Sequence, residues 1–393
     1  MNKRVYLDYA ATTPVKEEVF EEMKPYFTEK FGNPSSIYSY GREAKQPIDV
    51  ARTRIANAVG AKPEEIYFTA GGSESDNWAI KGIAFANKNK GNHIITTKIE
   101  HHAVLHTCEY LEKYGFEVTY LEVDEFGRIH LEDLEKAITD KTILISIMFA
   151  NNEIGTIQPI KEIGQIAREN KIYFHTDAVQ ALGNVKIDVD DLNIDSMSIS
   201  SHKIYGPKGI GAMYLRKGVK IHSFVHGGAQ ERKRRAGTEN VPGIVGFGKA
   251  AQLITENMDE HINHMMCLKD KLINGIIERI DFVKLNGHSE YRLPGNVNFI
   301  FEFIEGESLL LSLDLVGIAG SSGSACTSGS LDPSHVLMAL GLPHEIAHGS
   351  LRLTIGSFTT EEDIDYVLEE LPKIVQRLRD MSPLYEEVKG GQK

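Results

Sequence analysis

Short apolar runs alternate with stretches of helical periodicity along the first two-thirds of the chain. Five of these runs have the length of strands, and they span residues 65–69, 93–97, 142–148, 172–176 and 195–199. Helices are predicted between most of them, for example over residues 78–87 and 160–170. A strand–helix–strand series is typical of a mainly parallel, doubly wound sheet, so the chain is predicted to have an α/β fold.

The pattern changes after about residue 255. A long polar helix comes first, and strands mixed with helices follow at residues 296–303, 350–355 and 361–379. This mixture indicates a smaller α+β domain. We therefore predict a large domain over residues 15–255 and a small domain made of residues 1–14 and 256–393.

A polar cluster follows each of the five predicted strands. The clusters are Gly71-Gly72-Ser73, Glu100-His101-His102, Asn151-Asn152-Glu153, His175 with Asp177 and Gln180, and Ser200-Ser201-His202-Lys203. In an open parallel sheet the carboxyl ends of the strands lie at one edge, and ligands bind there. Five distant segments are therefore expected to meet in one crevice.

The first and fourth clusters each have a candidate binding role. Gly71 and Gly72 precede a helical run, and glycines there let backbone N–H groups approach a phosphate. The alternative is that Ser73 serves as a helix N-cap in a tight turn. Asp177 suits a protonated pyridine nitrogen, with a helix cap or an ion pair as the alternative.

Two lysines compete for the role of a reactive amine. Lys203 ends a buried strand beside a histidine, which favours a lowered pKa and Schiff-base chemistry, and Lys208 is its rival in the same loop. Among the histidines, His101 is a candidate to stack on a planar ring and to move protons. His102 and His106 are its competitors.

A second region of interest is the serine- and glycine-rich run at residues 320–333, which contains Cys326. Such a run favours a mobile arm that carries a thiol to a substrate and then elsewhere. Cys108 and Cys267 lie in helical contexts and are interpreted as core residues. Arg352 interrupts an apolar strand and suits a substrate carboxylate, with a solvent-facing strand arginine as the alternative.

Composition narrows the classes of function. The formal net charge of −12 argues against nucleic acid as a direct partner, so the basic run at residues 232–235 is interpreted as a solvated loop or a subunit contact. Three cysteines cannot form a disulfide framework, which predicts a reducing cytoplasm. No apolar run approaches the ~18 residues of a membrane span, and the first residues lack the apolar core of a secretory signal.

Together these clusters resemble those of the cysteine desulfurases of the NifS/IscS type. The similar segments are residues 72–77, 100–101, 151–155, 177–180, 201–209 and 321–327, within a likeness that runs from Tyr6 to Leu384. These enzymes are class-V members of the fold-type-I enzymes that use pyridoxal 5′-phosphate (PLP). The resemblance implies a large PLP-binding domain and a small domain that carries Cys326.

The resemblance also implies how the cofactor is held. Lys203 would bind PLP covalently, Asp177 would pair with the pyridine nitrogen, and His101 would stack on the ring and shuttle protons. Asn152 and Gln180 would bond the phenolic edge of the ring. The phosphate would be held by Gly72, Ser73, Ser200 and His202, together with Thr238 of the partner subunit in a homodimer.

For the reaction, the resemblance implies that Arg352 and Asn152 bind the carboxylate of L-cysteine. Cys326 would attack the substrate sulfur, leave L-alanine and carry a persulfide to an iron–sulfur scaffold protein or another sulfur acceptor. Cys326 would also serve as a transient iron–sulfur ligand shared with that scaffold. One rival interpretation is another PLP enzyme of the same fold, which has no use for a thiol at position 326. A second rival is a non-enzymatic scaffold or metal carrier, although the spacing of Cys and His lacks a metal-ligand pattern.

Overall fold

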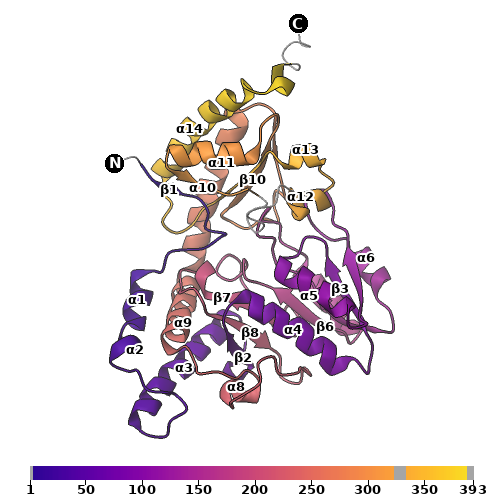
Figure 1. The fold of residues 1–393 in the computed structure, drawn as a ribbon, viewed down its shortest axis with the longest axis vertical. Coiled ribbons are helices and arrows are strands. Elements are labelled where there is room, and N and C mark those ends of the chain that lie inside the picture. The colour runs from indigo at the N-terminus through magenta and orange to yellow at the C-terminus, as the bar shows by residue number, and fades with distance from the viewer. Residues whose placement is uncertain (1–2, 323–332, 387–393) are drawn as a thin grey trace.

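The computed structural model describes residues 3–322 and 333–386. Its larger part contains a sheet of seven strands in the order β2-β8-β7-β6-β5-β3-β4 (Figure 1). The strands are β2 (Ile66–Thr69), β3 (His93–Thr97), β4 (Glu117–Leu121), β5 (Thr142–Ser146), β6 (Tyr173–Asp177), β7 (Ser196–Ser200) and β8 (Gly211–Leu215). All of them run parallel except β8, which is antiparallel to both of its neighbours.

The five predicted strands are β2, β3, β5, β6 and β7, so the predicted mainly parallel α/β fold is confirmed. Two strands were not predicted. β4 is an edge strand whose residues are mostly half-exposed, so it lacks the apolar run of a buried strand. β8 follows β7 after a connection too short for a crossover helix, and it therefore returns antiparallel.

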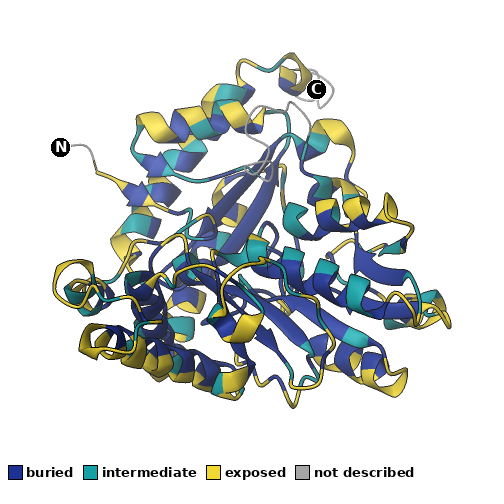
Figure 2. Ribbon diagram, turned by 60° about the horizontal axis from the view of Figure 1, so that its bottom comes forward, coloured by how far each residue is buried: buried dark blue, intermediate teal, exposed yellow. Residues whose placement is uncertain are grey.

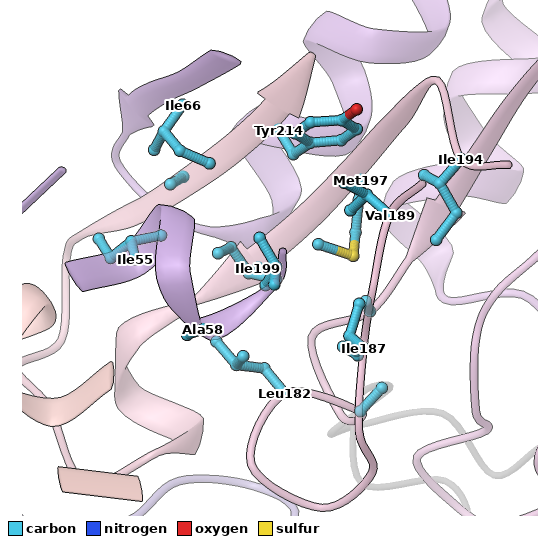
Figure 3. Close-up of a cluster of buried hydrophobic side chains, with 14 of the residues drawn as sticks. Ile55, Ala58, Ile66, Leu182, Ile187, Val189, Ile194, Met197, Ile199 and Tyr214 are labelled. Carbon is cyan, nitrogen blue, oxygen red and sulfur yellow. The ribbon is translucent and has the colours of Figure 1, made fainter. Parts of the chain in front are cut away.

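Helices cover both faces of this sheet because successive strand residues point to opposite sides. Ile145 of β5 packs in the cluster with α3 (Ser39–Ala58), α7 (Ile160–Glu169) and α9 (Val241–Glu256), part of which is shown in Figure 3. Leu144 packs on the other face with α4 (Gly72–Asn87) and α5 (His102–Glu112). The remaining helices of this part are α1 (Glu17–Met23), α2 (Pro25–Thr28), α6 (Leu131–Ala137) and α8 (Gln230–Lys233).

The smaller part is an antiparallel sheet in the order β12-β10-β9 that packs against helices. Its elements are α10 (Met258–Arg279), β9 (Val283–Leu285), β10 (Asn296–Phe301), α11 (Gly306–Leu315), β11 (Ile318–Ala319), α12 (His335–Ala339), α13 (His344–Ala347), β12 (Ser350–Thr354) and α14 (Glu361–Arg379). The N-terminal strand β1 (Val5–Tyr6) pairs in parallel with β11. The division into a large domain of residues 15–255 and a small domain of residues 1–14 and 256–393 stays a prediction. The seven-stranded sheet lies within the first of these ranges, and the three-stranded sheet lies within the second.

Burial follows this layered arrangement. Figure 2 shows that the strands are buried, whereas the helices expose their outer faces. Cys108 is buried as predicted, but Cys267 is exposed on α10, so its interpretation as a core residue is wrong. Among the described residues, no helix combines the length and the apolar character that crossing a membrane requires.

Candidate active site

A cavity of about 280 Å³ lies where the carboxyl ends of the parallel strands meet β12. Ten residues that the sequence singled out line it: Gly72, Ser73, His101, Asn152, Asp177, Gln180, Ser200, His202, Lys203 and Arg352. Ala10, Ala11, Asp76, Met148, Ala150 and Val179 complete the lining. The N-terminal segment, the strand ends and β12 therefore share one enclosed space.

One end of the cavity is formed by the start of α4, which begins at Gly72 and not at residue 78 as the pattern predicted. Gly71 is the N-cap at φ 157° and ψ −178°, a region that is essentially confined to glycine, so Ser73 is not the cap. A Cβ on Gly72 would lie 2.6 Å from Cγ2 of Val179. The free N–H groups of this first turn, with Ser73, Ser200 and His202 nearby, suit an anion.

Asp177 ends β6 and is a buried residue of the cavity lining. Its Oδ1 accepts a hydrogen bond from the N–H of Val179 at 2.9 Å. Burial raises the pKa of Asp177, while His101, this hydrogen bond and Lys203 oppose the rise. A cationic ring nitrogen placed against this carboxyl group would lower its pKa further and stabilise the ionised form.

The two candidate lysines differ in position, because Lys203 lines the cavity and Lys208 is exposed outside it. Lys203 lies in the 3-10 turn Ser201–Lys203 directly after β7. Its Nζ donates to the carbonyl of Ala10 and to that of Ala11, the latter at 2.8 Å. The N-terminal segment thus aims this amine across the cavity.

Of the three competing histidines, His101, His102 and His106, only His101 lines the cavity. It is the N-cap of α5, and its Nδ1 accepts a hydrogen bond from the N–H of Ala103 at 3.1 Å, which leaves Nε2 as the protonated nitrogen of the neutral ring. The rings of His102 and His335 lie 4.7 Å apart, outside the cavity lining. Burial and the neighbouring histidines lower the pKa of His102 to about 4.

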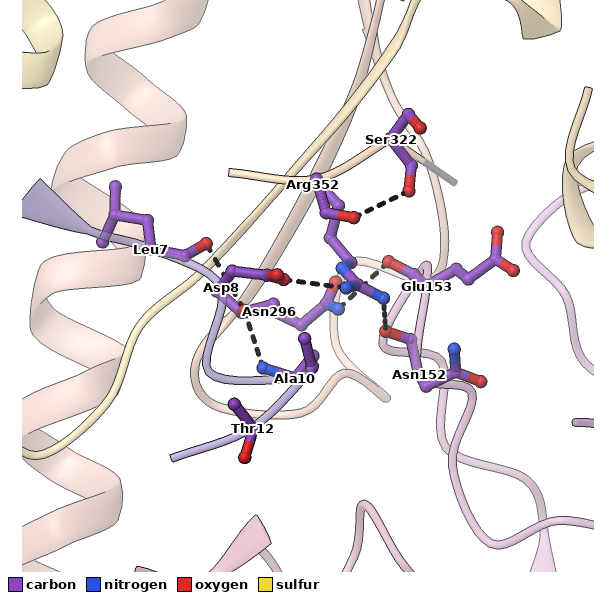
Figure 4. A network of polar contacts seen from close by, with 12 residues as sticks. Leu7, Asp8, Ala10, Thr12, Asn152, Glu153, Asn296, Ser322 and Arg352 are labelled. Carbon is purple, nitrogen blue, oxygen red and sulfur yellow. Dashed lines mark hydrogen bonds and ion pairs between the residues drawn. The ribbon is translucent and has the colours of Figure 1, made fainter. Parts of the chain in front are cut away.

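Arg352 does not face solvent, so that alternative is wrong: it is 3% exposed and lies in the middle of β12. Its Nη2 donates to Oδ1 of Asp8 at 2.8 Å, and its Nη1 donates to the carbonyl of Asn152 at 3.1 Å (Figure 4). On the far side of the amine, Gln180 donates from Nε2 to the carbonyl of Ala10 at 2.9 Å. The polar groups of the lining are thus held in place by backbone contacts.

Two predicted residues remain. Cys326 lies outside the described residues. Thr238 is exposed and does not line the cavity of its own chain. The basic run before it contacts its own chain, since Arg235 pairs with Glu74 at 2.8 Å and the guanidinium of Arg232 lies over the ring of Tyr67.

Sequence reasoning assigned no role to four acidic groups near the site, namely Asp8, Asp76, Glu100 and Glu153. Burial raises the pKa of Glu100 to about 8 and that of Glu153 to about 7, and it raises that of Asp76 well above its usual range. Asp76 lies three residues beyond Ser73 on α4, and Glu100 and Glu153 adjoin predicted residues, so spacing offered a signal for these three. Asp8 offered no local signal, because its partner Arg352 is 344 positions away.

The donor set fits PLP. A helix start that suits a phosphate, a carboxyl group that suits a ring nitrogen and a lysine amine that suits an aldehyde all line one cavity. Buried Oδ1 of Asp76 and Oε2 of Glu100 also lack a hydrogen-bond partner among the described residues. A polar ligand in this space would meet groups that are already oriented.

Comparisons with known proteins agree with this geometry. The aminotransferase class-V family pattern matches residues 5–367. The cysteine desulfurase IscS of Clostridium botulinum strain Hall is 64% identical over 389 residues, which cover 98% of each chain. A solved NifS-like protein is 41% identical with a TM-score of 0.90, covering 96% of this chain and all of its own. SspA in complex with cysteine is also 41% identical, with a TM-score of 0.80, covering 91% of this chain and all of its own.

These matches span nearly the whole chain, and they overturn the interpretation of a non-enzymatic scaffold or metal carrier. The chain belongs to the aminotransferase class-V family and, within it, to the cysteine desulfurases.

Proposed function

We propose that the cavity is the active site of this PLP-dependent cysteine desulfurase, with Lys203 as the residue that binds the cofactor. The enzyme converts L-cysteine to L-alanine and passes the sulfur to an acceptor. One observation carries the assignment of the site: Lys203, Asp177, the start of α4 and the buried Arg352 all line the same cavity.

The remaining lining residues would hold the cofactor. Gly72, Ser73, Ser200 and His202, which all line the cavity, would hold the phosphate, while Asn152 and Gln180 would bind the phenolic edge and His101 would stack on the ring. When bound, PLP supplies an electron sink that makes the substrate's Cα proton acidic and its C–S bond labile.

The chain's own groups then bind the substrate and move its protons. Arg352, with Asn152 beside it, holds the α-carboxylate of L-cysteine through charge-assisted hydrogen bonds. The Nζ of Lys203 would take the proton from Cα. Asp177 would pair with the ring nitrogen as a carboxylate, and His101 has Nε2–H available as a proton donor.

Cys326 is the proposed sulfur acceptor. Its thiolate would attack the substrate sulfur, so that an S–S bond forms while the Cβ–S bond breaks. The electron pair of the broken bond would stay with the substrate carbon, which is protonated to become the methyl group of L-alanine, and the persulfide would remain on Cys326. The flanks of its segment support this role. Ser321 pairs with Arg352 through backbone hydrogen bonds, and the hydroxyl of Ser334 donates to Glu153. Both ends of the segment are thus attached beside the cavity.

We also propose that the chain works as a homodimer. The aromatic and aliphatic side chains of Phe20, Phe27, Phe31, Ile37, Tyr38 and Tyr40 are exposed on or near α1, α2 and α3, and Ile37 is 90% exposed. A contiguous stretch of this kind is typical of a surface that a second subunit covers. Thr238, which does not reach its own cavity, would bind the phosphate in the partner's site.

The downstream partner is proposed on the family's chemistry alone. A persulfide on Cys326 suits transfer to an iron–sulfur scaffold protein, with Cys326 as a transient cluster ligand, or to another sulfur carrier. A reducing cytoplasm remains the predicted compartment, and Cys108 and Cys267 are both free thiols.

A direct test combines two variants with an assay of the purified enzyme. Lys203→Ala should lose the visible absorption of the bound cofactor and all alanine formation. Cys326→Ala should keep that absorption but lose sulfide release and protein-bound sulfane sulfur. Unchanged sulfide production by Cys326→Ala would instead favour a related PLP enzyme that does not use this thiol.

A further inference from the structure

Arg352 is a buried charge, and a buried charge is costly unless an opposite charge and hydrogen bonds compensate it. The compensating group is Asp8, which accepts from Nη2 at 2.8 Å and is itself 19% exposed at the side chain. Glu153 is the other carboxyl group that faces Arg352, and burial raises the pKa of Glu153 to about 7. Asp8 is therefore the direct ionic partner of the guanidinium.

The hydrogen bonds of Arg352 do not use all of its donors. A guanidinium has five N–H groups, and Asp8 and the carbonyl of Asn152 hold its two ends from different directions. Nε is buried and has no partner among the described residues. Because Arg352 lines the cavity, the N–H groups of Nη1 and Nη2 that Asp8 and Asn152 do not use can bind an arriving carboxylate.

Asp8 is itself held by the strand that carries Arg352. The N–H of Thr354 donates to the carbonyl of Leu7 at 2.7 Å, and the N–H of Ala10 donates to Oγ1 of Thr354 at 2.9 Å. The residues on both sides of Asp8 are thus attached to β12. This arrangement makes the position of the Asp8 carboxylate relative to Arg352 rigid.

We propose that Asp8 is a positioning residue for substrate binding: it orients the Arg352 guanidinium so that the remaining N–H groups of Nη1 and Nη2 can bind the α-carboxylate of L-cysteine. This inference rests on the proposed function, because it assumes that Arg352 binds the substrate. A merely structural Asp8 would tie down the N-terminal segment without affecting recognition of the carboxylate.

The test compares L-cysteine with cysteamine, which has the same amine and thiol but no carboxylate. In the holoenzyme, Asp8→Ala should raise KM for L-cysteine by about tenfold, the loss expected for one charge-assisted hydrogen bond, with kcat changed less than about threefold. The affinity for cysteamine, measured by the change in cofactor absorption, should stay within about twofold of the original enzyme. Asp8→Asn keeps an oxygen acceptor and should give a smaller rise in KM.

Lys3→Gln is the matched control, because Lys3 lies on the same N-terminal segment as Asp8 and forms an ion pair with Asp363 of α14. This variant should bind L-cysteine and cysteamine as the original enzyme does. Equal losses for L-cysteine and cysteamine in Asp8→Ala, or an unchanged KM, would overturn the role of Asp8. Arg352→Gln tests the role of Arg352 separately from the role of Asp8. If that variant loses L-cysteine selectively while Asp8→Ala does not, only the Asp8 inference fails. If Arg352→Gln binds both ligands normally, the proposed role of Arg352 fails.

Discussion

The two halves of the cavity are built in different ways. The half proposed for the cofactor comes from strand ends of one sheet, and its phosphate end consists largely of backbone at the start of α4. The half proposed for the substrate joins Asp8 of the N-terminal segment, Asn152 of a loop and Arg352 of β12. The first half follows from local geometry, whereas the second depends on buried charges brought together from distant positions. A substitution should therefore act through cofactor chemistry in the first half and through recognition or pH response in the second.

The largest effect is expected at Asp177. Asp177→Asn keeps the shape and an oxygen that accepts from Val179, but it removes the charge opposite the ring nitrogen. We expect kcat for L-cysteine to fall by about 10²- to 10³-fold, as for loss of another preorganised electrostatic group, while the bound cofactor remains visible by absorption. Activity within about tenfold of the original enzyme would show that this half does not depend on the carboxylate.

A steric change at the phosphate end should have a smaller effect. Gly72→Ala places a Cβ 2.6 Å from Cγ2 of Val179, and overpacking of this kind costs about 1–3 kcal/mol. We expect the cofactor dissociation constant, measured by equilibrium dialysis, to rise by about ten- to a hundredfold. The double variant with Val179→Ala should recover much of the loss. No recovery would mean that Gly72 is needed for a reason other than space.

The smallest effect concerns the substrate half and its dependence on pH. Burial raises the pKa of Glu153 from 4.5 to about 7, so the folded chain holds a proton that the unfolded chain has released between these values. Stability should therefore fall as the pH rises through this window. Glu153→Gln stays neutral, and its Tm should fall less between about pH 5 and pH 7. Glu100→Gln, in the cofactor half, should flatten the same curve up to about pH 8. Parallel curves for Glu153→Gln and the original enzyme would contradict the buried-carboxyl explanation.

The contrast between the two halves of the cavity also explains which features the sequence predicted and which it did not. Periodicity located β2, β3, β5, β6 and β7, and the polar residues after them predicted nine members of the cavity lining, while Arg352 was identified as a charge within an apolar strand. It missed β4, whose residues are half-exposed, and β8, whose direction depends on a short connection. The residue pattern also left open the choice between Lys203 and Lys208, because sequence does not reveal which of two lysines in a loop points into a cavity.

The sequence by itself determined the alternation of strands and helices and the polar residue types at the strand ends, because both are local properties of period and position. Only the tertiary structure decided that Asp8 pairs with Arg352, that Glu100 and Glu153 are buried, and that α4 begins at Gly72 against Val179. These features arise from contacts between segments far apart in the chain. Their energies depend on burial and distance, which are set only when the chain is folded.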